Sequence, residues 1–70
     1  MTKSECLAAV QEWWPECDGV DCLDLWKGNN RYRARGTYKG FEVLLFASGK
    51  TPQAAYRALV DEAKRRKGRG

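Results

Sequence analysis

The chain has 70 residues and a net charge of +4, enough length for one domain and too little for two. Hydrophobic residues make up 43% of it and include three Trp, which excludes a disordered composition. No apolar run approaches the roughly 20 residues of a membrane-spanning helix. The N-terminal residues have no signal-peptide core, so we expect a cytoplasmic protein.

The charge is unevenly distributed along the chain. Residues 1–30 hold two basic groups against six acids, and residues 31–70 hold eleven basic groups against three acids. Such a dipolar molecule can contact nucleic acid with its basic end and basic surfaces with its acidic end.

The three cysteines, Cys6, Cys17 and Cys22, are an odd number in a chain expected in a reducing compartment. Four residues separate Cys17 from Cys22, but the chain has no histidine and no second close cysteine pair to complete a metal site. We therefore interpret the cysteines as small thiols that are buried in the core, and we expect no metal and no cofactor.

The first predicted helix begins at a capping box, with Thr2 as N-cap and Glu5 three residues later. Its apolar stripe comprises Leu7, Val10 and Trp14, with Cys6 and Trp13 on the flank. Pro15 is expected to end it, because the residue before proline disfavours the helical conformation.

Three strands are predicted, at residues 20–27, 31–38 and 41–48. Asn29-Asn30 and Lys39-Gly40 are each expected to form a two-residue hairpin loop, since asparagine and glycine tolerate positive φ. Loops of this length fix the register, because opposed residues share a face. One face then carries Leu23, Leu25, Tyr32, Ala34, Gly36, Tyr38, Phe41, Val43, Leu45 and Ala47, and the other carries Cys22, Asp24, Trp26, Arg31, Arg33, Arg35, Thr37, Glu42, Leu44 and Phe46.

A second helix is predicted after Thr51-Pro52, a typical N-cap followed by proline at the first helical position. Its apolar side comprises Pro52, Ala55, Tyr56, Leu59, Val60 and Ala63. These elements predict an α+β two-layer sandwich, αβββα, in which both helices cover the first sheet face and the second face stays bare. We expect a single domain over residues 1–66 and a basic flexible tail over residues 67–70.

The bare sheet face is the predicted binding surface. In the expected register Trp26, Arg33 and Phe46 lie abreast, so the guanidinium can stack between two rings. The next row holds Asp24, Arg35 and Leu44, with an ion pair between the first two. These six residues either solubilise a bare sheet or form an interface for a partner, since Trp, Phe and Arg are enriched at binding hot spots.

A nucleic-acid surface is the alternative prediction. Its residues are Lys50, Arg57, Lys64, Arg65, Arg66, Lys67 and Arg69, and each neutralised phosphate adds salt-dependent affinity. The cluster near the C-terminus is equally typical of a solvated helix end, where cations suit the helix dipole.

Catalysis is not expected. The chain has no histidine, so no ordinary Cys–His or Ser–His nucleophile pair can form. Its glycines lack the spacing of a phosphate-binding loop, and a domain of this size has little room for a pocket that excludes water.

The order of elements resembles that of double-stranded-RNA-binding domains. The run Ser48-Gly49-Lys50-Thr51-Pro52-Gln53-Ala54-Ala55-Tyr56-Arg57-Ala58-Leu59 is similar to their passage from the last strand into the second helix. That family's lysine cluster is reduced here to Lys50 and Arg57, and its first hairpin loop is longer and holds a histidine. The resemblance therefore implies a shared fold more than a shared set of RNA-binding residues.

The same run, together with the small size, also resembles small phage-encoded accessory proteins such as anti-CRISPR inhibitors. This likeness implies an inhibitor that docks on a host protein or nucleoprotein complex and blocks it sterically, as a monomer or as a homodimer through the bare face. A toxin–antitoxin partner is a third possibility.

Overall fold

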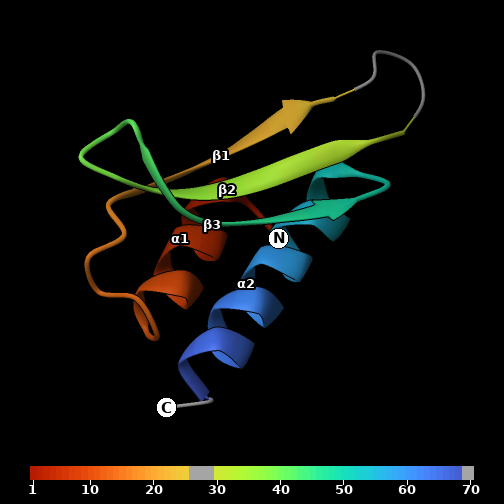
Figure 1. Ribbon diagram of the computed structural model, residues 1–70. Helices are drawn as coiled ribbons and strands as arrows, with labels where there is room; N and C mark the ends of the chain where they lie inside the picture. Colours follow the sequence, from red (N-terminus) through yellow and green to blue (C-terminus); the bar gives the residue numbers. More distant parts are fainter. Residues whose placement is uncertain (26–29, 69–70) are drawn as a thin grey trace.

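One antiparallel sheet forms one layer of the molecule, and two helices form the other layer on a single side of it (Figure 1). The computed structural model describes residues 1–25 and 30–68. The elements are α1 (Lys3–Gln11), β1 (Gly19–Asp24), β2 (Tyr32–Tyr38), β3 (Glu42–Gly49) and α2 (Pro52–Gly68), with strand order β1-β2-β3. The predicted αβββα sandwich is confirmed. Among the described residues, neither helix combines the length and the apolar character needed to cross a membrane.

The capping box at the start of α1 forms as predicted. The Glu5 backbone N–H donates to Thr2 Oγ1 at 3.2 Å, and the Thr2 N–H donates to Glu5 Oε1 at 3.0 Å. The helix ends at Gln11, four residues before the proline expected to end it. Beyond Gln11 the chain tightens, because the Trp13 N–H donates to the Val10 carbonyl, only three residues back, at 3.0 Å.

The register between β1 and β2 differs from the predicted one by three residues. Asp21 lies opposite Arg35 and Cys22 opposite Ala34, whereas a two-residue loop would place Asp24 opposite Arg35. The hairpin connection is longer than expected, because the Leu25 N–H donates to the Arg31 carbonyl at 2.8 Å and residues 26–30 separate the two.

An odd register shift moves every side chain of a strand to the other face. Val20 and Cys22 therefore lie on the helix side, where Val20 is buried. Leu23, predicted to face the helices, lies on the side without helices, and so does Leu25 just beyond the strand.

The turn between β2 and β3 holds three residues instead of two, because Tyr38 lies opposite Glu42. Lys39 and Gly40 have positive φ there, 57° and 78°. The turn includes Phe41, which is 76% exposed instead of facing the helices.

A β-bulge in β3 changes the register a second time. Thr37 lies opposite Val43 and Gly36 opposite Leu45, so Leu44 has no direct partner on β2. Val43 consequently lies on the side without helices, contrary to the prediction, and Leu44 packs against the buried core.

The core lies between the sheet and the helices. Its fully or nearly fully buried hydrophobic side chains are Cys6, Val10, Cys17, Val20, Ala34, Leu45, Ala55, Leu59 and Ala63. In α2 the buried positions recur every fourth residue, as one helical face requires. The start of α2 is capped as predicted, since the Ala54 N–H donates to Thr51 Oγ1 at 3.0 Å.

Candidate functional site

The sheet side without helices carries several large apolar side chains that remain accessible to water. Leu23, Leu25, Val43 and Phe46 are 39%, 43%, 44% and 49% exposed. The same side carries Asp21, Arg33 and Arg35. These seven residues are the open face. Because Phe46, Arg33 and Arg35 were predicted here, the arginine–aromatic character of the surface agrees with the prediction.

A cation–π contact orders the centre of the open face. The Arg33 guanidinium carbon lies 5.0 Å from the centre of the Phe46 ring. The two residues are diagonal neighbours, because Arg33 lies opposite Ser48 and Phe46 opposite Arg35. The predicted contact between Arg33 and Phe46 is therefore present in a different register, and stacking between two rings stays a prediction. Trp26, the other predicted ring, lies outside the described residues.

Arg35 forms a bidentate ion pair on the same face. Its Nε donates to Asp21 Oδ1 at 2.9 Å and its Nη2 to Oδ2 at 2.6 Å. These hydrogen bonds lower the pKa of the Asp21 carboxyl. The predicted pair between Arg35 and Asp24 is wrong, because the register shift places Asp21 opposite Arg35 and Asp24 opposite Tyr32.

The apolar residues of the open face differ from the predicted ones. Leu44 is withdrawn toward the core at the bulge, whereas Leu23, Leu25 and Val43 were assigned to the helix side and lie on the open face. These residues were assigned to the wrong face because the predicted strand register was wrong.

A shallow cavity of about 610 Å³ adjoins the open face at the end where α2 begins. Its lining comprises Leu25, Asn30, Arg31, Arg33, Ser48, Gly49 and Lys50. Three of these residues are cationic and none is acidic. A cavity at this place was not predicted, because its walls come from both strands of the first hairpin and from residues 48–50 and depend on the strand register.

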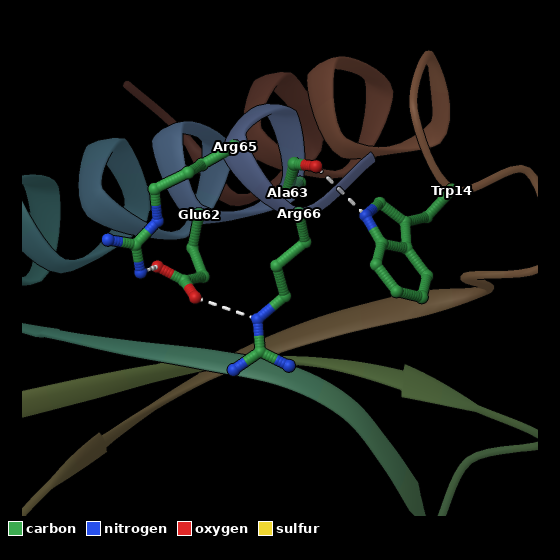
Figure 2. Close-up of polar contacts among 5 residues, drawn as sticks. All are labelled: Trp14, Glu62, Ala63, Arg65 and Arg66. Atoms are coloured by element: carbon green, nitrogen blue, oxygen red, sulfur yellow. Dashed lines mark hydrogen bonds and ion pairs between the residues drawn. The ribbon is translucent and has the colours of Figure 1, made fainter. Parts of the chain in front are cut away.

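The basic end of α2 is engaged within the molecule (Figure 2). Glu62 accepts hydrogen bonds from Arg65 and, at 2.7 Å, from Arg66 Nε. The bond from Arg66, followed by the charge of Arg65, lowers the pKa of Glu62. These arginines are thus already paired with a carboxylate.

Contacts of Trp14 with Ala63 and Lys67, named the clasp, join this end of α2 to the turn after α1. The Trp14 Nε1–H donates to the Ala63 carbonyl at 3.1 Å, as Figure 2 shows. Lys67 Nζ lies 4.4 Å from the centre of the Trp14 ring and 4.0 Å from a Glu16 carboxylate oxygen. The helix continues to Gly68, beyond the expected domain boundary at residue 66.

The residues of the predicted nucleic-acid surface lie at both ends of α2. Lys50 precedes α2 and Lys64 lies near its end, about 20 Å away at 1.5 Å of rise per residue. Arg65, Arg66 and Lys67 have acidic partners. Arg57 is exposed between these groups, and Arg69 lies outside the described residues.

The three thiols are free, and two of them are buried in the core. Burial raises the pKa of Cys6 to about 11, and burial likewise raises the pKa of Cys17 and of the half-buried Cys22. Across residues 1–25 and 30–68, no group of cysteine, aspartate and glutamate side chains has the arrangement of a metal site. Cys6 and Cys17 are core residues, as predicted.

Comparisons of the chain with protein-family models, with curated proteins and with solved structures found no match. The resemblances to double-stranded-RNA-binding domains and to small phage inhibitors stay predictions.

Proposed function

We propose that the chain is a non-enzymatic binding protein that docks on a partner protein through the open face. The observation that supports this proposal is the exposure of four large apolar side chains on one side of the sheet, Leu23 and Leu25 along β1 and Val43 and Phe46 on β3, on either side of the arginines of β2. Exposed apolar side chains gathered on one face of a small domain are typical of interaction sites.

The polar groups of the open face suit an interface as well. The Arg33 guanidinium is held against Phe46 and the Arg35 guanidinium against Asp21, so both have little side-chain freedom left to lose on binding. Arginine and aromatic residues in desolvated positions are the residues that dominate interface energetics. We infer that the apolar side chains supply the affinity and that the two arginines fix the orientation of the partner.

The role that fits this surface is steric inhibition of a host protein or nucleoprotein complex, in the manner of small phage-encoded inhibitors. The support for the role is the small size of the domain and the breadth of the binding face relative to it. A second copy of the chain is the other occupant that the same face would accept, and it would give a homodimer.

The test compares substitutions on the two sides of the molecule. Val43→Glu and Leu23→Glu each place a charge on the open face, and Ala8→Glu places the same charge on the exposed side of α1. In affinity capture from a bacterial lysate, we expect a partner that is retained by wild type and Ala8→Glu and lost by both open-face variants. Each charge at a desolvated contact should weaken binding at least about tenfold, or 1.4 kcal/mol.

Two further measurements separate the competing occupants. Sedimentation at high concentration detects a homodimer, and Val43→Glu should abolish it. Titration with duplex RNA at two salt concentrations tests the alternative nucleic-acid function. Salt-dependent RNA binding that Val43→Glu leaves unchanged, with no captured protein, would contradict docking through the open face.

A further inference from the structure

The cavity beside the start of α2 shares Leu25 and Arg33 with the open face and differs from it in charge. Arg31, Arg33 and Lys50 line it, and no carboxylate does. None of these three cations has an ion pair within the part of the chain that the structure describes. Arg35, on the same side of the sheet, is by contrast paired with Asp21. The cavity therefore brings together three cations that have no ion-pair partner among the described residues.

Arg33 is the fixed element of this cavity. Its ring contact with Phe46 orients the guanidinium, and its Nε is buried with no hydrogen-bond acceptor among the described residues. An oriented guanidinium is also prepared for bidentate recognition of an oxyanion.

The other walls supply neutral groups suited to the same kind of ligand. Ser48 and Asn30 contribute a hydroxyl and an amide, and Gly49 leaves its backbone uncovered. The N-terminus of α2 follows directly, and its first turn contains no acidic residue. The positive end of the helix dipole therefore adds to the field of the three cations.

The charge of the site selects the ligand class. A carboxylate would neutralise one of the three cations, whereas a diphosphate carries about three negative charges and two successive phosphodiesters carry two. We propose that this cavity binds two neighbouring phosphate groups, which are either the diphosphate of a free nucleotide or two successive phosphodiesters of a nucleic-acid strand. The Leu25 side chain leaves one wall apolar, where the uncharged part of such a ligand can rest. This inference does not depend on docking through the open face.

The test uses inorganic pyrophosphate as the probe and calorimetry or NMR titration as the readout. Wild type should bind with a dissociation constant of about 1 mM or tighter, and Arg31→Gln and Lys50→Gln should each weaken binding about tenfold. Arg57→Gln is the matched control, because it removes the same charge from an exposed position on α2 outside the cavity. We expect it to change the affinity less than about twofold.

Arg33→Lys tests the guanidinium itself, because it keeps the charge and loses the planar fork. Circular dichroism checks that each variant is folded. If Arg33→Lys does not fold, the variants at the exposed residues Arg31 and Lys50 still test the proposal. Val43→Glu should leave pyrophosphate binding within about twofold, which distinguishes this site from the docking surface.

Parallel titrations identify the source of the phosphates. Tighter binding of ADP than of pyrophosphate assigns the cavity to free nucleotides, and tighter binding of a single-stranded oligonucleotide assigns it to nucleic acid. Three results would overturn the proposal. They are the absence of binding at millimolar pyrophosphate, equal losses in Arg57→Gln and the cavity variants, and binding of an acidic peptide alone.

Discussion

At the scale of single residues, Gly49 shows how closely the end of β3 approaches the first turn of α2. A Cβ atom at this position would lie 2.5 Å from the Ala55 backbone nitrogen and 2.7 Å from the Ala54 carbonyl carbon. Both are backbone atoms, so the contact cannot be relieved by rotating a side chain. The absence of a side chain at residue 49 lets the helix start directly after the strand, which places Lys50 at the cavity.

We therefore expect Gly49→Ala to destabilise the fold by about 1–3 kcal/mol, the usual cost of overpacking. For a domain of this size that corresponds to a loss of about 4–8 °C in Tm for each kcal/mol. Thermal unfolding followed by circular dichroism measures it. Ser48→Ala, at the exposed neighbouring residue, is the control and should shift the Tm far less; equal shifts would show that the close approach is unimportant.

At the scale of elements, the two helices are joined by the clasp around Trp14 as well as by the core. The indole N–H satisfies the Ala63 carbonyl, and Lys67 covers the ring. The last turns of α2 extend beyond the strands, so these contacts replace the support that the sheet gives to the first turns (Figure 1).

Trp14→Phe should weaken this support, because phenylalanine keeps a ring and lacks the N–H donor. Losing the hydrogen bond from the indole to the Ala63 carbonyl should lower the free energy of unfolding by about 1 kcal/mol. Urea unfolding gives this value, and hydrogen exchange should become faster at residues 63–67. Trp13→Phe is the control, because Trp13 is also half-buried and its indole has no hydrogen bond to the described residues. The clasp is refuted if the two variants lose the same stability and protection.

Element order and helix caps could be predicted from the sequence, because capping residues and apolar spacing act locally. Register could not. Asn29-Asn30 suggested a two-residue loop, but the strands first pair at Leu25 and Arg31. The run from Val43 to Phe46 is apolar throughout, so no alternation marked the bulge at Leu44. The predicted Arg33–Phe46 contact is present because the register of β2 and β3 is shifted there by two residues, and an even shift keeps both side chains on the same face.

The engagement of the basic helix end could have been predicted. Glu62 precedes Arg65 and Arg66 by three and four residues, the spacing at which side chains meet on a helix. The clasp could not, because Trp14 and Ala63 are 49 residues apart in the chain. The cavity was equally inaccessible to sequence reasoning, since it depends on the true register of β1 and β2.

At the scale of the whole molecule, the buried thiols make stability depend on alkaline pH. Burial raises the pKa of Cys6 from 9.0 to about 11, so between these values the folded state holds a proton that the unfolded state has lost. A raised pKa of this kind stabilises the fold fully below the unfolded value, and the contribution is lost as the pH rises through the folded value.

We expect the free energy of unfolding to fall from about pH 9 to pH 11, with up to about 1.4 kcal/mol per pH unit arising from Cys6. Cys6→Ala removes this proton, so its stability should depend less steeply on pH than that of wild type. Urea unfolding at several pH values measures both slopes. Identical slopes would show that the Cys6 thiol titrates normally in the folded protein. Cys22→Ala, at the half-buried thiol, tests whether the effect is specific to Cys6.

The pairing of α1 with α2 also determines when the chain can fold. The Cys6 thiol donates to the Tyr56 carbonyl at 3.6 Å across 50 residues, and both helices cover the same sheet face. During synthesis, α1 and the three strands emerge before most of their covering layer exists. The apolar side of the sheet that faces the helices therefore stays exposed to solvent until α2 has been synthesised. Contacts between residues this far apart in the chain also form slowly. We expect the nascent chain to acquire its structure in one late step instead of growing it from the N-terminus.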